Sequence, residues 1–190
     1  MRALTFMASA ALVLGACGGA AQPAATTAPP ATAAPTVAAT TAAPTPATKL
    51  TFTADMRSEN EVPPIANEEK SGSGKATVAF DLTRDGAGAI TAAKASIDLT
   101  LTGFPVTTAI TLGHIHNAPA GANGGVKVGF KTDAANPLNL TTGAATFTKA
   151  DVTVDPAVMQ QIIDKPADFY VNFHSVLNPG GVVRGQLVKG

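Results

Sequence analysis

Apolar and polar residues alternate along most of the chain after Lys49, with the period of two that is typical of half-buried strands. The alternation is clearest in three successive stretches, 49–57, 75–83 and 89–102. Polar turns such as Arg84–Gly86 separate them. Because strands joined by short turns run in opposite directions, this part of the chain predicts an antiparallel sheet.

The rest of the chain repeats the pattern and adds one helix. Further strands are predicted over 108–116, 126–130, 138–148, 168–175 and 182–188. A helix is predicted between the strands 138–148 and 168–175. Asp155 can cap this helix, Pro156 suits its first turn and Pro166 ends it. Its apolar stripe comprises Val158, Met159, Ile162 and Ile163. A single short helix needs packing to be stable, so we expect it to lie on the sheet as a lid.

These elements predict an all-β fold, a Greek-key β-sandwich or barrel of about eight antiparallel strands with one short helix. We place this domain at residues 49–190, a length that suits a single core. Its acidic and basic residues nearly balance, and no basic stripe is present, so nucleic acid is not an expected partner.

The first 48 residues follow a different pattern, typical of an export signal and a linker. Arg2 is their only charged residue, and the apolar run after it is too short to cross a membrane as a helix. Leu14-Gly15-Ala16-Cys17 resembles the bacterial lipobox. The resemblance implies that residues 1–16 are a lipoprotein signal peptide and that Cys17 is lipidated. The alternative is an ordinary cleaved signal with Cys17 as a bystander.

Residues 17–48 begin with this cysteine and continue as an uncharged segment rich in Ala, Thr and Pro. Such a segment cannot bury enough apolar surface to fold, so we predict a disordered linker. Cys17 is the only cysteine, which excludes an intramolecular disulfide. The domain must therefore be stabilised by its hydrophobic core alone. The expected location is the outer face of a bacterial membrane, with the lipid as the membrane anchor.

The chain has only three histidines, and two of them lie two residues apart on one predicted strand. In an extended strand, His114 and His116 point the same way as Ile110, whereas Ile115 points to the opposite face. Turn-forming residues follow at once, up to Gly125, and leave both rings at the rim of the sheet. A His-x-His pair in this setting can bind one metal ion.

The third histidine, His174, shares a strand face with Tyr170 and Asn172. If the two histidine strands are neighbours, three neutral imidazoles form a trigonal face for one copper or zinc ion, with a fourth position open. Tyr170 and Asn172 would then hold the ligand side chains in place without binding the metal themselves. Alternatively, the histidines bond to loop carbonyls and to Asn172 or Tyr170, and lock the rim without an ion.

Four stretches in this order resemble the CHRD domain, the module repeated in chordin and found as a single copy in exported bacterial proteins. They are Glu61–Pro64, Gly113–His116 with its glycine loop, Tyr170–His174 and Pro179–Gln186. The resemblance spans Leu50–Val188 and implies an extracellular location. In chordin-like proteins the domain binds other proteins there. The motifs that contain Glu61 and Arg184 also suggest a charge-assisted structural ion pair between them.

The histidine strand and its glycine loop are also similar to the copper-ligand strand of copper-zinc superoxide dismutase. No further histidine exists to bridge a second metal, so the dinuclear site of that enzyme cannot be assembled. The sequence has no nucleophile elbow, no phosphate loop and no His-Glu-x-x-His helix, and we expect no enzyme.

Three hypotheses follow. The first is a membrane-anchored, extracytoplasmic binding protein that holds copper or zinc for storage, handover or protection. The second is an extracellular interaction or adhesion module with structural histidines and a protein partner. The third, a redox enzyme that uses bound copper, ranks last.

Overall fold

The computed structural model describes residues 45–190. The predicted signal peptide 1–16, Cys17 and most of the predicted linker 17–48 lie outside the described residues. The first strand, β1 (Thr45–Arg57), begins at Thr45 instead of Lys49. The other elements are β2 (Ser73–Arg84), β3 (Ile90–Thr102), β4 (Ala109–Asn117), β5 (Gly125–Lys131), β6 (Leu138–Asn139), β7 (Ala145–Val154), α1 (Pro156–Asp164), β8 (Phe169–Ser175), β9 (Val183–Gln186) and β10 (Val188–Lys189), with 3₁₀ turns at Ser58–Asn60, Glu68–Ser71 and Pro166–Asp168.

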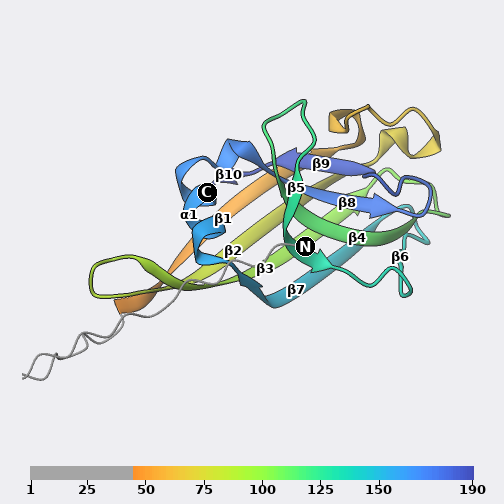
Figure 1. Cartoon of the computed structure of the whole chain (residues 1–190). Coiled ribbons are helices and arrows are strands. Elements are labelled where there is room, and N and C mark those ends of the chain that lie inside the picture. The colour runs from red at the N-terminus through yellow and green to blue at the C-terminus, as the bar shows by residue number, and fades with distance from the viewer. Residues whose placement is uncertain (1–44) are drawn as a thin grey trace, which may run out of the picture. The chain divides into compact units, whose positions relative to one another are not determined.

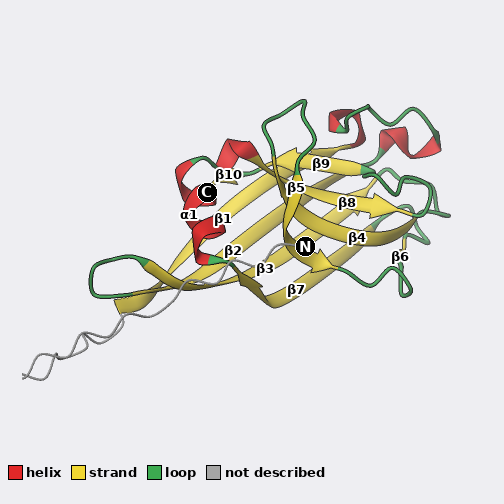
Figure 2. Cartoon of the chain, viewed as in Figure 1, coloured by secondary structure: helices red, strands yellow, loops and turns green. Residues whose placement is uncertain are grey.

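Eight strands form one antiparallel sheet in the order β5-β4-β8-β9-β1-β2-β3-β7, and the sheet curls into a nearly closed barrel (Figures 1 and 2). The short strands β6 and β10 pair with β4 and β1. Strands β8 and β9, from the end of the chain, lie between β4 and β1. The prediction of an all-β fold with about eight antiparallel strands and one short α-helix is therefore confirmed for the described residues.

The alternating residues of the first strands fill the barrel. Phe52, Val78, Phe80 and Ile97 are all fully buried. The rings of Phe52 and Phe80 meet edge to face with centroids 5.6 Å apart, a favourable arrangement for aromatic pairs. The polar residues between them face outward, as the period of two requires.

The helix α1 begins as predicted. The carboxylate of Asp155 accepts hydrogen bonds from the backbone N–H groups of Ala157 and Val158. Met159 and Ile162 are buried in the same core as the strands, which supports the expected role as a lid. None of the helices in residues 45–190 has the length and apolarity that a bilayer crossing requires.

The prediction of one strand over 138–148 is wrong. β6 ends at Asn139 and β7 begins at Ala145, and a turn closed by the hydrogen bond from Gly143 N–H to the Leu140 carbonyl (2.8 Å) separates them. Leu140 is buried in the core, so the apolar residues that suggest a continuous strand come from two elements and the turn between them.

Candidate metal centre

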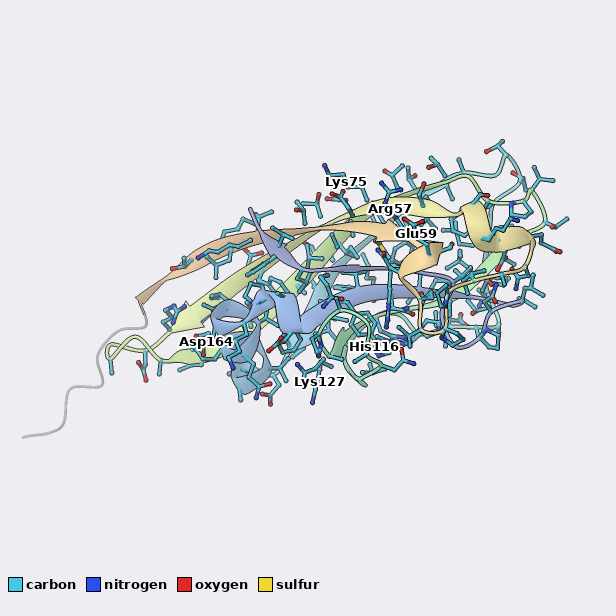
Figure 3. The ribbon with its side chains drawn as sticks, turned by 90° about the horizontal axis from the view of Figure 1, so that it is seen from above. Arg57, Glu59, Lys75, His116, Lys127 and Asp164 are labelled. Atoms are coloured by element: carbon cyan, nitrogen blue, oxygen red, sulfur yellow. The ribbon has the colours of Figure 1, made fainter. Side chains whose placement is uncertain are left out.

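Strands β4 and β8 pair directly, as the metal hypothesis requires. In the antiparallel register, His116 lies opposite Tyr170, and His174 lies opposite Leu112, two residues before His114. The three histidines therefore come from neighbouring strands and lie on one face of the sheet. Figure 3 shows the side chain of His116 on the opposite side of the ribbon from Lys75.

One prediction about this strand is wrong. Ile110 does not share the face of His114 and His116 but lies in the core together with Ile115. The pairing of β4 with β8 shifts register between Ile110 and Leu112. A β-bulge inserts an extra residue into one strand and so reverses the alternation beyond it.

Gly113 in the histidine strand serves the core. A Cβ at this position would lie 2.2 Å from the ring of Phe173, so the ring packs directly on the strand backbone. The residue immediately before His114 thus faces inward, and the absence of a side chain there leaves room for the Phe173 ring over the histidine strand.

The three imidazoles converge. Nδ1 of His114 lies 3.2 Å from Nε2 of His174. One nitrogen from each of the rings of His114, His116 and His174 lies within 4.8 Å of the others. Within residues 45–190, no other group of three or more His, Cys, Asp or Glu side chains meets this condition.

Backbone carbonyls orient two of the rings from outside the cluster. Nδ1–H of His116 donates to the carbonyl oxygen of Gly124, and Nδ1–H of His174 donates to that of Pro179, each at 2.9 Å. Both Nε2 atoms therefore carry lone pairs. Nε2 of His116 is buried and has no hydrogen-bond partner among the described residues. Metal-binding histidines are typically held by such a bond on their other nitrogen.

All three histidines are held neutral. Burial is the main cause, and it lowers the pKa of His114 to about 4, helped by the neighbouring His174 and His116. Burial also lowers the pKa of His116 and of His174, although the bonds to the Gly124 and Pro179 carbonyls act in the opposite direction. Neutral imidazoles can donate a lone pair to a metal ion at neutral pH.

Tyr170 packs against one ring of the cluster. Its ring stacks on His116 with centroids 5.0 Å apart and planes 6° apart. The Arg184 guanidinium carbon lies 4.6 Å from the centroid of the same ring. Tyr170 Oη also accepts a hydrogen bond from the N–H of Gly124 at 3.3 Å. Tyr170 thus contacts a histidine ring and the loop that orients it.

The predicted pair of Glu61 and Arg184 is present, but it is loose. Both side chains are buried, and Nε of Arg184 lies 3.9 Å from Oε2 of Glu61. Asn172 Nδ2 donates to Glu61 Oε1 at 2.7 Å. Burial raises the pKa of Glu61 to about 7, since Arg184 and Asn172 offset only part of the desolvation.

Gly181 makes room for this buried pair. Its φ angle of 136° suits glycine, and a Cβ there would lie 2.8 Å from Oε2 of Glu61 and 2.7 Å from Nδ2 of Asn172. Asn172 therefore supports Glu61, and its hydrogen bond goes to that carboxylate.

Sequence reasoning missed several groups that build the site. Two are the backbone carbonyls of Gly124 and Pro179, which no side-chain pattern marks. A third is Asn123, whose Oδ1 accepts from Arg184 Nη1 at 3.0 Å. The only signal was its place in the glycine loop after the histidine strand. The aspartates Asp55, Asp98 and Asp151 are exposed and do not belong to the histidine cluster.

Comparison with protein families identifies the module. The family model of the CHRD domain matches residues 52–187, which confirms the predicted resemblance. No curated protein and no solved structure matches the chain. Because the family match covers well over half of the sequence and nearly all of the barrel, the chain belongs to the CHRD domain family.

Proposed function

We propose that this CHRD-domain protein is anchored outside the cytoplasm and binds one copper or zinc ion through His114, His116 and His174. The observation that carries the proposal is the convergence of three ring nitrogens, one of them buried without a partner among the described residues. Two nitrogens bound to one ion at 2.0–2.1 Å, about 100–110° apart, are separated by about 3.1 to 3.4 Å. The 3.2 Å between His114 and His174 suits that geometry.

The donor set favours a transition metal. Neutral imidazoles suit copper and zinc, whereas calcium and magnesium prefer oxygen ligands. Copper(II) binds such nitrogen sites more tightly than zinc does, so we place copper first. Three protein ligands leave a position for water or another ligand, which suits storage, handover or protection. We propose no catalytic role.

Metal titration of the whole chain, purified without a histidine tag, tests the proposal. We expect one equivalent of Cu(I), Cu(II) or Zn(II), and a loss of at least 100-fold in affinity for the double variant His114→Ala/His116→Ala, since removing two of three ligands leaves a single imidazole. Tyr170 is the only tyrosine and there is no tryptophan, so copper binding should quench an emission that reports on the site.

Asp98→Asn provides the matched control, because Asp98 is exposed on a strand outside the histidine site. This variant should bind metal like the wild type. Equal and weak binding by the wild type and the double histidine variant would refute the metal site.

The second candidate function is an extracellular interaction or adhesion module with structural histidines. The observation in its favour is that His116 and His174 each tie down a loop through a backbone carbonyl. This function predicts that a protein partner is recovered by crosslinking on intact cells, and that chelators do not change the yield. A chelator-dependent yield would contradict it.

Membrane anchoring rests on the lipobox resemblance at Leu14–Cys17. Mass spectrometry of the mature N-terminus should find acyl chains on Cys17, and Cys17→Ala should release the protein from the membrane fraction because the anchor is lost. An unmodified Cys17 in the mature protein would favour the ordinary cleaved signal.

A further inference from the structure

The β4–β5 loop, residues 118–124, contacts both the histidine cluster and the buried Arg184. On the cluster side, the Gly124 carbonyl accepts from His116 Nδ1–H at 2.9 Å, and the Gly124 N–H donates to Tyr170 Oη at 3.3 Å. The orientation of the His116 ring therefore depends on where this loop lies.

Arg184 holds the same loop from the other side. Its Nη1 donates to the carbonyl oxygen of Ala122 and to Oδ1 of Asn123, each at 3.0 Å, and its Nε donates to the carbonyl oxygen of Asn60 at 2.6 Å. Asn123 Nδ2 in turn donates to the carbonyl oxygen of Val62 at 2.8 Å. One arginine whose side chain is only 2% exposed thus ties the β4–β5 loop to the 58–62 segment.

Arg184 also reaches His116 by a second route. Its guanidinium lies over one ring, that of Tyr170, and this ring stacks on His116. A planar guanidinium can make such a stacking contact and several directed hydrogen bonds at once, which a lysine ammonium cannot. Both contacts that orient His116, the Gly124 carbonyl and the Tyr170 ring, are therefore held by one arginine.

We propose that Arg184 is a positioning residue of the histidine cluster, which raises its metal affinity by holding the β4–β5 loop and Tyr170 against His116. This inference rests on the proposed metal-binding function. It gives the Glu61–Arg184 pair, expected from sequence to be purely architectural, a part in the site.

The positive charge of Arg184 acts against this role, because a cation near a metal dication weakens binding. Two substitutions separate the effects. Arg184→Lys keeps the charge but loses the planar fork, whereas Arg184→Met loses both. If positioning dominates, both variants bind metal more weakly, by 10- to 100-fold as is typical when an outer partner of a ligand is lost. If charge dominates, Arg184→Met binds more tightly and Arg184→Lys is unchanged.

The experiment measures Cu(II) and Zn(II) affinity of the whole chain for the wild type, Arg184→Lys and Arg184→Met. In the metal-free proteins, NMR of the His116 ring nitrogens reports whether the proton stays on Nδ1, which a purely structural role for Arg184 would not alter. Arg84→Met is the matched control, since Arg84 Nη1 also donates to a backbone carbonyl, that of Gly88, at 2.8 Å in the turn after β2. It should bind metal normally.

A milder variant keeps the test decisive if both Arg184 variants fail to fold. Asn123→Ala removes one acceptor of Arg184 and the bond to Val62 without removing the guanidinium, and should weaken metal binding several-fold. Folded variants that bind metal like the wild type, with the His116 proton unmoved, would overturn the role of Arg184 alone. A wild type that binds no metal would instead overturn the proposed function.

Discussion

Both faces of β8 are buried, but apolar side chains cover one face and polar groups cover the other. On the inner face, Phe169 and Phe173 belong to the apolar core of the barrel. On the outer face, Tyr170, Asn172 and His174 are buried as well. Here the contacts come from neighbouring polar side chains and from loop carbonyls, such as that of Pro179.

The comparison shows what each kind of burial can leave incomplete. An apolar face needs only side chains that pack closely, whereas each buried polar atom needs a hydrogen-bond partner or a ligand. Five buried side-chain polar atoms lack a partner in the described residues. Three of them lie among the buried polar side chains that β4, β8 and β9 contribute to the outer face, which we call the polar layer: His116 Nε2, Asn172 Oδ1 and Arg184 Nη2. An unsatisfied group costs about 1–3 kcal/mol, so this layer is where a bound ligand would add most to stability.

Phe173→Ala should give the largest loss of stability, because it leaves a cavity in the apolar core on the inner face of β8. The ring packs against Gly113 and lies 5.9 Å from that of Phe147. We expect the free energy of unfolding to fall by about 3–5 kcal/mol, as for other buried phenylalanines. Urea unfolding of the metal-free chain, followed by circular dichroism, measures it. A loss below about 1 kcal/mol would mean that the inner face does not depend on tight packing.

Glu61→Gln tests the polar layer through its pH dependence. Because the pKa of Glu61 is raised from 4.5 to about 7 in the folded state, its contribution is most favourable below pH 4.5 and is lost as the pH rises through 7. Glutamine stays neutral and avoids this loss. Relative to the wild type, the variant should therefore gain about 3 kcal/mol between pH 4 and pH 8. A pH-independent difference between the two proteins would contradict the raised pKa.

The apolar core inside the barrel, which includes the inner face of β8, was more predictable than the polar layer. The period of two placed Phe52, Val78 and Phe80 in the core, because alternation is a local property of extended backbone. The capping of α1 by Asp155 was also predictable, since the cap and the helix are adjacent in sequence.

The polar layer could be predicted only in part. The sequence pointed to all three histidines, but not to the bulge between Ile110 and Leu112, because one inserted residue leaves no mark in composition. Nor did it reveal the carbonyl of Asn60 as a partner of Arg184, since the two lie 124 positions apart. Such contacts depend on how the loops pack over the finished sheet.

His114 should give a smaller pH effect than Glu61, and one of opposite sign. Its pKa is lowered from 6.5 to about 4, so its contribution to stability is present above pH 6.5 and is lost as the pH falls toward 4. Because the ring is partly exposed, we expect about 1–2 kcal/mol after solvent screening. The stability difference between the wild type and His114→Gln in metal-free protein measures it. An NMR titration midpoint near 6.5 would show that the ring is not desolvated.

Tyr170→Phe should give the smallest effect, because it changes one contact and keeps the stack on His116. The variant loses the hydroxyl that accepts from the Gly124 N–H at 3.3 Å, a long bond worth about 0.5–1 kcal/mol. Tyr170→Leu also loses the ring contacts with His116 and Arg184, and should cost about 1 kcal/mol more and weaken metal binding further. Titrations of both variants rank the two contacts. If phenylalanine were as damaging as leucine, the hydroxyl and not the stack would hold His116, and the polar layer would depend on hydrogen bonds alone.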